Sequence, residues 1–236
     1  MTRMIAHRGY SGRYPGNTAL AFEMAAKNGS AGAETDIRRT KDGIYVTSHD
    51  AEAVFFDGTE RVVAESTWAE LTEKPLLNRK TDDTVYLCSF RRYLEIMRDN
   101  GMVCFIELKG AFTDEQVKEV FSLAAEVYDL GKCILQSFDF DNLLKCRSLF
   151  PDLPLMFTYG SGQDRWECCF DHGISLDADR IVLTEEMIRA FHGHGLDVGV
   201  WTVNDPAQLV RFRALGVDWI ESDVFGGSLP EEGGGV

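Results

Sequence analysis

The sequence predicts an α/β protein, a (β/α)8 TIM barrel with a small insertion after the second strand. Short apolar runs of strand length alternate with longer segments of helical periodicity along the 236 residues, which is typical of βα units and a parallel sheet. Eight such runs occur, and the chain length lies in the range of barrels that form one domain. An open parallel sheet is the alternative, but the glycine-rich phosphate-binding fingerprints of open nucleotide-binding sheets are missing from the sequence.

The predicted strands are short runs dominated by apolar residues. The first, MIAH, starts close to the N-terminus, and the last, WIESD, follows a Gly-Val-Asp turn near the C-terminus. The strands are expected at residues 4–7, 31–37, 103–108, 133–138, 154–159, 174–177, 198–203 and 219–223.

The predicted helices lie between these strands and have recognisable ends. Gly29 and Gly101 end the first two, because glycine readily adopts the left-handed conformation that terminates helices. Thr113 and Gln116 have the spacing of a capping box, and Pro206 suits the first position of the last helix. The helices are expected at residues 17–28, 90–100, 113–130, 140–150, 164–171, 184–194 and 205–215.

One stretch departs from the alternation of strand and helix. Residues 41–43, Lys-Asp-Gly, are a hairpin turn signal directly after the second strand. Residues 51–88 then intervene before the next helix, and we interpret them as a small insertion. The whole is expected to form a single domain over residues 1–225, followed by a loose tail over residues 226–236.

The hairpin has a predicted register. Pairing about the turn is expected to place Glu34 opposite His49, and Asp36 opposite Thr47. A slip of one residue would turn these side chains to the other face of the hairpin.

Composition and charge limit the possible partners. The chain has 38 acidic and 24 basic residues, so its net charge of −14 repels polyanions and disfavours nucleic acid as a partner. A small phosphate ester stays possible, because a local cluster of cations or a metal ion reverses the sign inside a pocket. No apolar window reaches the length of a membrane span, so no stable membrane insertion is expected. The sequence contains no indication of an oligomeric state.

Cysteine usage and the N-terminus favour a cytoplasmic protein. The six cysteines include no CxxC pair and no zinc-ligand pattern with nearby histidines. The first strand begins within six residues of the N-terminus, which leaves no room for a secretory leader.

Acidic side chains occur at the ends of the second and third predicted strands. Glu34 and Asp36 are two residues apart, so in a strand they point to the same face. Adjacent buried carboxylates repel one another and need a proton, a cation or solvent, and Mg²⁺ or Ca²⁺ is one solution. Glu107 interrupts the apolar run VCFIEL and could supply a third ligand. The alternative is a pair of hydrogen-bonded acids beside Arg38 and Arg39.

Histidines and cations occur at the same strand ends. His7 and Arg8 end the first strand, Lys109 follows the third, and His49 belongs to the hairpin. Because catalytic groups of a (β/α)8 barrel project from the carboxyl ends of its strands, these side chains are expected to meet. Histidine titrates near neutral pH, so one could accept a proton while the other donates one. Cations and a metal would neutralise a phosphate, and the set suits cleavage of a phosphate ester.

Six short motifs stand in a fixed order along the chain: His7-Arg8-Gly9, Pro15-Gly16-Asn17-Thr18, Glu34-Thr35-Asp36, Lys41-Asp42-Gly43, His49-Asp50 and Glu107-Leu108-Lys109. In this order the motifs resemble the glycerophosphodiester phosphodiesterase family. The resemblance spans residues 4 to about 224 and also includes Gln136-Ser137-Phe138, Trp201-Thr202-Val203-Asn204 and the closing GVDWIESD.

The resemblance implies a TIM barrel with a small insertion and metal-dependent hydrolysis of glycerophosphodiesters to sn-glycerol 3-phosphate and an alcohol. It implies that His7 and His49 are the general acid–base pair. It further implies phosphate contacts from Arg8 and Lys109 and a pocket wall formed by Trp201. The implied ligands of one divalent cation, Mg²⁺ or Ca²⁺, are Glu34, Asp36 and Glu107.

One position departs from the family pattern, since Gly16 stands where the family has glutamate. A noncatalytic member that binds phosphodiesters is therefore one alternative. A phospholipase similar to sphingomyelinase D is another, but the acidic chain lacks a basic amphipathic stretch for a membrane surface. The alcohol group of the substrate could be choline, ethanolamine, inositol or glycerol.

Overall fold

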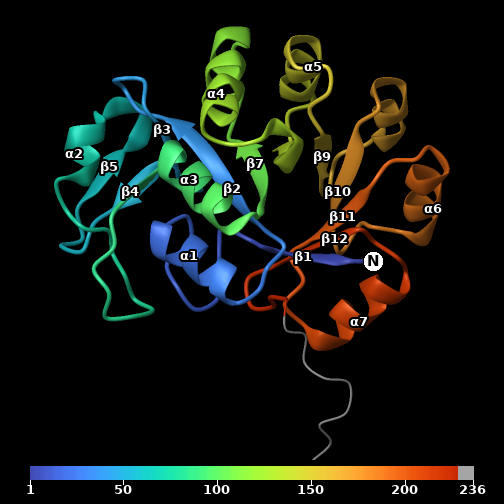
Figure 1. The fold of residues 1–236 in the computed structure, drawn as a ribbon, viewed down its shortest axis with the longest axis horizontal. Coiled ribbons are helices and arrows are strands. Elements are labelled where there is room, and N and C mark those ends of the chain that lie inside the picture. The colour runs from blue at the N-terminus through green and yellow to red at the C-terminus, as the bar shows by residue number, and fades with distance from the viewer. Residues whose placement is uncertain (228–236) are drawn as a thin grey trace, which may run out of the picture.

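The computed structural model describes residues 1–227 and contains a closed barrel of eight parallel strands (Figure 1). Closure follows from the first strand, which pairs with the last strand at Met4 and Ile220 and with the second at Ile5 and Gly32. The predicted barrel is confirmed, and the open sheet is wrong. In barrel order the strands are β1 (Arg3–Ala6), β2 (Gly32–Arg39), β7 (Val103–Leu108), β8 (Cys133–Ser137), β9 (Leu155–Tyr159), β10 (Ser175–Asp179), β11 (Val198–Trp201) and β12 (Trp219–Ser222).

Helices surround the barrel, and several begin at the residues that the sequence indicates. Thr113 and Gln116 form the expected capping box, and Pro206 occupies the start of the last helix. The helices are α1 (Ala19–Lys27), α3 (Phe90–Asn100), α4 (Asp114–Val127), α5 (Phe140–Leu149), α6 (Glu185–Gly193) and α7 (Pro206–Ala214), with a short 3₁₀ segment η2 (Leu130–Lys132) before β8.

One predicted helix has a different form. The segment expected as a helix over residues 164–171 is a 3₁₀ helix, η3 (Trp166–His172). Arg165 and Gly173 flank it with φ values of 69° and 59°. Left-handed residues thus bound the segment at both ends, and short segments of this kind commonly take the 3₁₀ form as connectors.

The insertion after β2 forms a small layer beside the barrel (Figure 1). It has its own apolar cluster, which includes Val46, Phe55 and Leu71. Its elements are β3 (Tyr45–Thr47), β4 (Glu52–Val54), β5 (Glu60–Val62), the 3₁₀ turn η1 (Val63–Glu65), α2 (Trp68–Thr72) and β6 (Cys88–Ser89).

The hairpin register differs by one residue from the prediction. Thr47 of β3 pairs with Ile37 of β2 rather than with Asp36. Thr40 and Ile44 close the turn through a backbone hydrogen bond, which places Asp42 at its centre. The same shift removes the expected pairing of Glu34 with His49, because β3 ends at Thr47.

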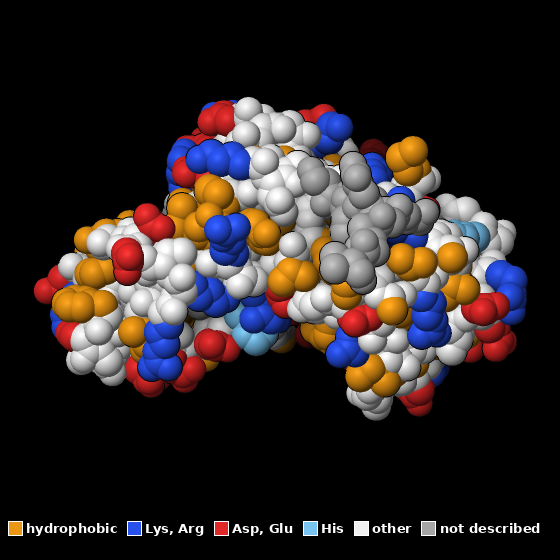
Figure 2. Space-filling model, turned by 90° about the horizontal axis from the view of Figure 1, so that it is seen from below, with side chains coloured by type: hydrophobic (Ala, Val, Ile, Leu, Met, Phe, Trp, Pro, Cys, Tyr) orange, Lys and Arg blue, Asp and Glu red, His pale blue; other side chains and the backbone are white. Residues whose placement is uncertain are grey.

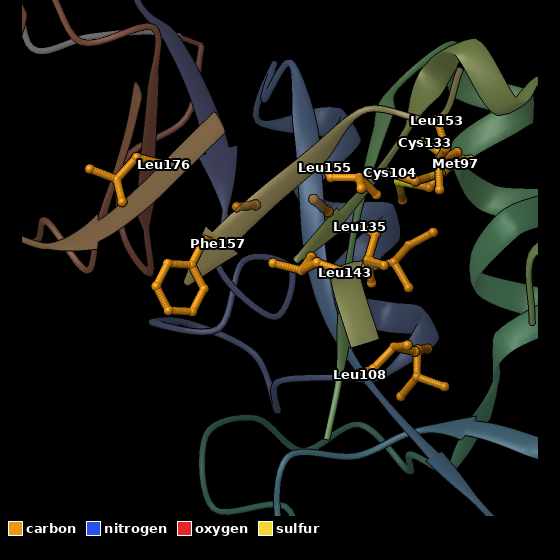
Figure 3. Close-up of a cluster of buried hydrophobic side chains, with 14 of the residues drawn as sticks. Met97, Cys104, Leu108, Cys133, Leu135, Leu143, Leu153, Leu155, Phe157 and Leu176 are labelled. Carbon is orange, nitrogen blue, oxygen red and sulfur yellow. The ribbon is translucent and has the colours of Figure 1, made fainter. Parts of the chain in front are cut away.

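The main core lies between the outer face of the barrel and the helices. Leu135 and Leu155 of paired strands belong to this core together with Leu143 of α5 and Met97 of α3 (Figure 3). Burial of such side chains contributes about 1.5–3 kcal/mol each and holds the helices on the barrel.

Inside the barrel, an apolar layer occupies the end near the strand N-termini. The apolar layer comprises Ile5, Phe105, Ile134, Met156 and Trp219. The Arg3 guanidinium covers the Trp219 ring at 3.5 Å, and the Trp219 indole N–H donates to Asp197 at 2.9 Å. This end of the barrel is therefore filled by side chains.

The surface has no broad region of a single sign on the face drawn in Figure 2, where acidic and basic side chains are intermixed. None of the helices within residues 1–227 has both the length and the apolar character needed to cross a bilayer. The predicted loose tail falls, except for its first two residues, outside the described residues.

Candidate active site

A polar cavity of about 90 Å³ opens at the carboxyl end of the barrel strands, above the apolar layer. Side chains alternate along each strand, so the inward position above an apolar-layer residue is two residues further along. Every predicted site residue except Asp36 lines the cavity. Its walls are His7, Arg8, Glu34, His49, Glu107, Lys109, Gln136, Phe138, Thr158, Asp177, Trp201 and Glu221.

Three carboxylates at this end are close together. Oxygens of Glu34, Asp36 and Glu107 lie within 4.8 Å of one another. The Lys109 ammonium contacts Asp36 Oδ1 at 2.8 Å and Glu107 Oε1 at 2.6 Å, which places Asp36 directly behind the cavity wall. The Asn17 amide donates to Asp36 Oδ2 at 2.6 Å. Lys109 thus joins Asp36 to Glu107, and Glu34 lies beside this pair.

Burial and charge perturb these acids in different directions. Burial raises the pKa of Glu34 well above its ordinary value, and the Asp36 charge adds to the effect. Burial alone would raise the pKa of Asp36, but Lys109 and Arg8 lower it below the usual range. For Glu107, burial outweighs Lys109, so its pKa is raised.

The donor set fits a hard divalent cation. The Oε1 atom of Glu34 is buried and has no hydrogen-bond partner within residues 1–227. Carboxylate oxygens are the donors that Mg²⁺ and Ca²⁺ prefer. The alternative of acids paired with Arg38 and Arg39 has no support, because Arg38 donates to the His49 carbonyl and Arg39 lies beside Glu119.

His7 is held by a partly buried carboxylate. Its Nδ1 lies 2.8 Å from Asp223 Oδ1, which leaves Nε2 as the nitrogen available to a ligand. Asp223 also accepts from Ser11 Oγ at 2.7 Å and from Asn204 Nδ2 at 2.6 Å. Burial opposes ionisation of Asp223, but the bonds from His7, Ser11 and Asn204 lower its pKa below the ordinary range.

His49 lies at the outer edge of the same cavity. Its Nδ1 is 2.8 Å from Asp50 Oδ1, and its carbonyl accepts from the Arg38 guanidinium. The side chains of His49 and Asp50 are 39% and 77% exposed, against 16% and 28% for His7 and Asp223. His49 reaches the cavity despite the shifted register, because it follows the end of β3 and strand alternation no longer sets its direction.

The loop after β1 is bent by left-handed residues. Arg8 has φ 56° and Gly9 has φ 76°, and this bend lets the Arg8 backbone N–H donate to Glu34 Oε2 at 2.9 Å. A side chain at Gly9 would clash with the Ala21 backbone at 2.7 Å. The Arg8 guanidinium Nε is 3.4 Å from Asp36, so the bend sets both the main chain and the side chain of Arg8 at the acids.

Two acids of the site are not among the residues that the sequence predicts. Asp177 and Glu221 are 2% and 3% exposed, and Gln136 Nε2 donates to both, at 2.9 Å and 2.6 Å. Burial raises the pKa of both carboxyls well above their ordinary values. Gly199 makes room, because a Cβ there would lie 2.6 Å from Asp177 Oδ1. Asp177 and Glu221 could have been recognised in the sequence, because each is an acidic residue at an inward-facing position of a predicted strand.

Gly16 lies beside a second, larger groove of about 590 Å³ between the barrel and the insertion. The groove shares Arg8 and His49 with the polar cavity, so the two are adjacent. A Cβ at Gly16 would be 3.2 Å from Arg8 Cβ and 3.3 Å from Ser11 Cβ, which is a close fit. Because Gly16 has no side chain, nothing projects into the groove from this position.

Comparison with known proteins agrees with this arrangement. The model of the glycerophosphoryl diester phosphodiesterase family matches residues 7–226. A glycerophosphodiester phosphodiesterase of Bacillus altitudinis is 27% identical over 235 residues, which cover 94% of this chain and 95% of the relative.

Solved structures share the fold. A glycerophosphodiester phosphodiesterase from Thermotoga maritima superposes with a TM-score of 0.75 at 26% identity, covering 94% of this chain and 95% of that one. An Oleispira antarctica phosphodiesterase in complex with the product sn-glycerol-3-phosphate has a TM-score of 0.82 at 20% identity, covering 94% and 93%.

Proposed function

The chain belongs to the glycerophosphoryl diester phosphodiesterase family, and we propose that it hydrolyses glycerophosphodiesters to sn-glycerol 3-phosphate and an alcohol with the help of one divalent cation. The observation that carries the proposal is the convergence of two histidines, two cations and three carboxylates on one small cavity. The Oleispira antarctica protein with the same fold was solved with sn-glycerol-3-phosphate, which supports this substrate class.

The two histidines are proposed as the acid–base pair. They line one cavity, and each has its Nδ1 beside a carboxylate, so each can present Nε2 to a substrate. One takes a proton from the attacking water as the oxygen of this water forms a bond to phosphorus. The other gives a proton to the alcohol oxygen as the old oxygen–phosphorus bond breaks.

The cations and the aromatic residue are proposed to hold the substrate. Arg8 and Lys109 face the cavity and would bind phosphate oxygens, since guanidinium and ammonium groups form strong charge-assisted hydrogen bonds. Burial alone would lower the pKa of Lys109, but Asp36 and Glu107 raise it, so the ammonium stays charged. Trp201 would flank the glycerol carbons.

A divalent cation held by Glu34, Asp36 and Glu107 would neutralise negative charge on the phosphate oxygens. Mg²⁺ and Ca²⁺ both suit oxygen ligands, and measuring product release with each ion compares them directly. Lys109 contacts Asp36 and Glu107, and it would be free to turn toward the phosphate if such an ion compensated these acids.

The test is an assay of glycerol 3-phosphate release after treatment with EDTA, using diesters of choline, ethanolamine, inositol and glycerol. We expect no release without metal and recovery with Mg²⁺ or Ca²⁺. His7→Ala and His49→Ala should each lower kcat by ~10²–10⁴. His192→Ala is the matched control, because that exposed histidine pairs with Asp218 away from the cavity.

Two results would contradict the proposal. Turnover that is indifferent to chelation would remove the cation from the reaction, and near-normal turnover of either histidine variant would remove that histidine. Absence of glycerol 3-phosphate with every diester would instead favour the noncatalytic alternative or the one similar to sphingomyelinase D.

A cytoplasmic location is also proposed. All six cysteines are free thiols, and five of them are buried. Unpaired thiols in this number are typical of a reducing compartment. Fractionation of the native host, with detection by antibody, would test the location.

A further inference from the structure

The cavity holds more buried carboxylates than the proposed cation site uses. Arg8 and Lys109 both lie beside Asp36, and Lys109 also pairs with Glu107. Within residues 1–227, no lysine or arginine forms a side-chain ion pair with the three remaining acids, which are Glu34, Asp177 and Glu221. Buried charges need compensation, and a single divalent ion beside Glu34 would leave Asp177 and Glu221 without it.

We propose that His7, Glu34 and Glu221 form a second cation site, adjacent to the first and sharing Glu34, that selects a borderline transition metal such as Zn²⁺. One ligand atom from each of the three residues lies within 4.8 Å of the others. This inference goes beyond the proposed function and concerns an ion that hydrolysis does not require.

The imidazole is arranged as metal-binding histidines are. A ligating histidine usually donates its second ring N–H to a carboxylate, which fixes the tautomer and raises the basicity of the ligating nitrogen. His7 has this partner in Asp223, at 2.8 Å from Nδ1, and Asp223 is itself held by Ser11 and Asn204. The nitrogen left for an ion is Nε2.

Glu221 and Glu34 also have features of carboxylates that bind a metal ion. Gln136 holds Glu221 through Oε1 at 2.6 Å, as ligating carboxylates are held by neighbouring donors. Glu34 is 2% exposed, and its Oε1 is buried without a hydrogen-bond partner in the described part of the chain. An unsatisfied buried oxygen is costly, and a cation is a partner that would remove this cost.

The two sites differ in the donor atoms that they offer to a metal ion. The first site offers only carboxylate oxygens, which suit Mg²⁺ and Ca²⁺ but also bind Zn²⁺ when neither of those ions competes, as in the Zn²⁺ dialysis below. The second adds an imidazole nitrogen, and one nitrogen with two carboxylates suits Zn²⁺ with a position left open. A carboxylate that serves both ions through its two oxygens is compatible with a two-metal arrangement.

Occupation of the second site would have a functional consequence. An ion on Nε2 prevents His7 from accepting or donating a proton there. Zn²⁺ should therefore inhibit the hydrolysis that Mg²⁺ supports, and Glu221→Gln should weaken this inhibition.

The test counts bound Zn²⁺ by equilibrium dialysis and elemental analysis of the full chain at micromolar free Zn²⁺. We expect two ions per chain in the wild type and one in Glu221→Gln. Asp36→Asn is the matched variant of the first site and should also bind one. His192→Ala should keep two, which shows that the exposed histidine does not contribute.

A second variant guards against a folding defect in Glu221→Gln. His7→Gln removes the nitrogen ligand from a different strand and should also bind one ion, with near-ultraviolet circular dichroism unchanged in both. A single ion in the wild type, or two ions in both Glu221→Gln and His7→Gln, would overturn the inference. Absence of hydrolysis in Mg²⁺ or Ca²⁺ without Zn²⁺, in a protein that still binds two Zn²⁺ ions by dialysis, would refute the proposed function alone.

Discussion

Asp223→Asn is predicted to lower kcat by ~10²–10⁴ without changing KM, because Asp223 positions His7 and does not touch the substrate. Asp223 accepts three side-chain hydrogen bonds, from His7 and Ser11 at Oδ1 and from Asn204 at Oδ2. An asparagine has only one oxygen, so it cannot accept on both sides.

Either orientation of the new amide is unfavourable. With its oxygen toward His7, its NH₂ group meets the Asn204 NH₂ donor, which lies 2.6 Å from the present Oδ2. If the NH₂ group of the asparagine points toward His7, the imidazole must accept this hydrogen bond at Nδ1 and carry its own proton on Nε2. In this tautomer Nε2 cannot accept a proton, so His7 cannot act as a base through that nitrogen. A hydrogen bond to a charged group contributes about 1.5–3 kcal/mol, so losing it alone accounts for one to two powers of ten in rate.

The matched control is Asp50→Asn. Its bond to His49 has the same length, 2.8 Å, but Asp50 is 77% exposed and Asp223 is 28% exposed. Solvent replaces most of an exposed pair, so we expect at most a loss of about tenfold. The assay measures kcat and KM for glycerol 3-phosphate release with saturating Mg²⁺. Equal losses in the two variants, or a kcat of Asp223→Asn near that of the wild type, would refute the reasoning.

Three further predictions concern stability and specificity. Because the pKa of Asp223 is lower in the folded state, its ionised form stabilises the protein above pH ~4, and this contribution disappears as pH falls through the folded-state pKa; urea unfolding should show the stability gap between the wild type and Asp223→Asn narrowing at low pH. The pKa of Asp177 is raised, so its ionisation destabilises the folded state as pH rises above ~4; Asp177→Asn should stabilise the EDTA-treated protein by about 1–3 kcal/mol at pH 7 and not at pH 3, and no gain at pH 7 would contradict this. Gly16→Glu should keep hydrolysis of small diesters within about threefold but raise KM for the inositol diester, because Gly16 lines the groove; equal KM changes for ethanolamine and inositol diesters would exclude a role of the groove in recognition.

The barrel could be predicted because its signals are local. Each strand is a short apolar run, and each helix begins or ends at residues with a defined conformational preference, such as Thr113 and Gly101. The 3₁₀ form of η3 could not be predicted, since Arg165 supplies one of its left-handed flanks and arginine has no such preference.

The candidate site was predictable where side chains belong to motifs. Its remaining members depend on packing across the barrel: Asp223 reaches His7 from the opposite end of the chain, and Gln136 joins Asp177 to Glu221 from a third strand. The shifted hairpin shows the limit of register arguments, since His49 reaches the cavity from a loop that pairing rules do not describe.

Side chains fill the barrel near the strand N-termini, where Arg3 covers Trp219. This filled end affects the order in which a cation and a substrate can reach the acids. Ligands therefore approach the acids from the carboxyl end of the strands, where Arg8 and His49 line the cavity. A diester bound there, as we propose, would cover the acids, so we expect the cation to bind before the diester and to leave after the glycerol phosphate.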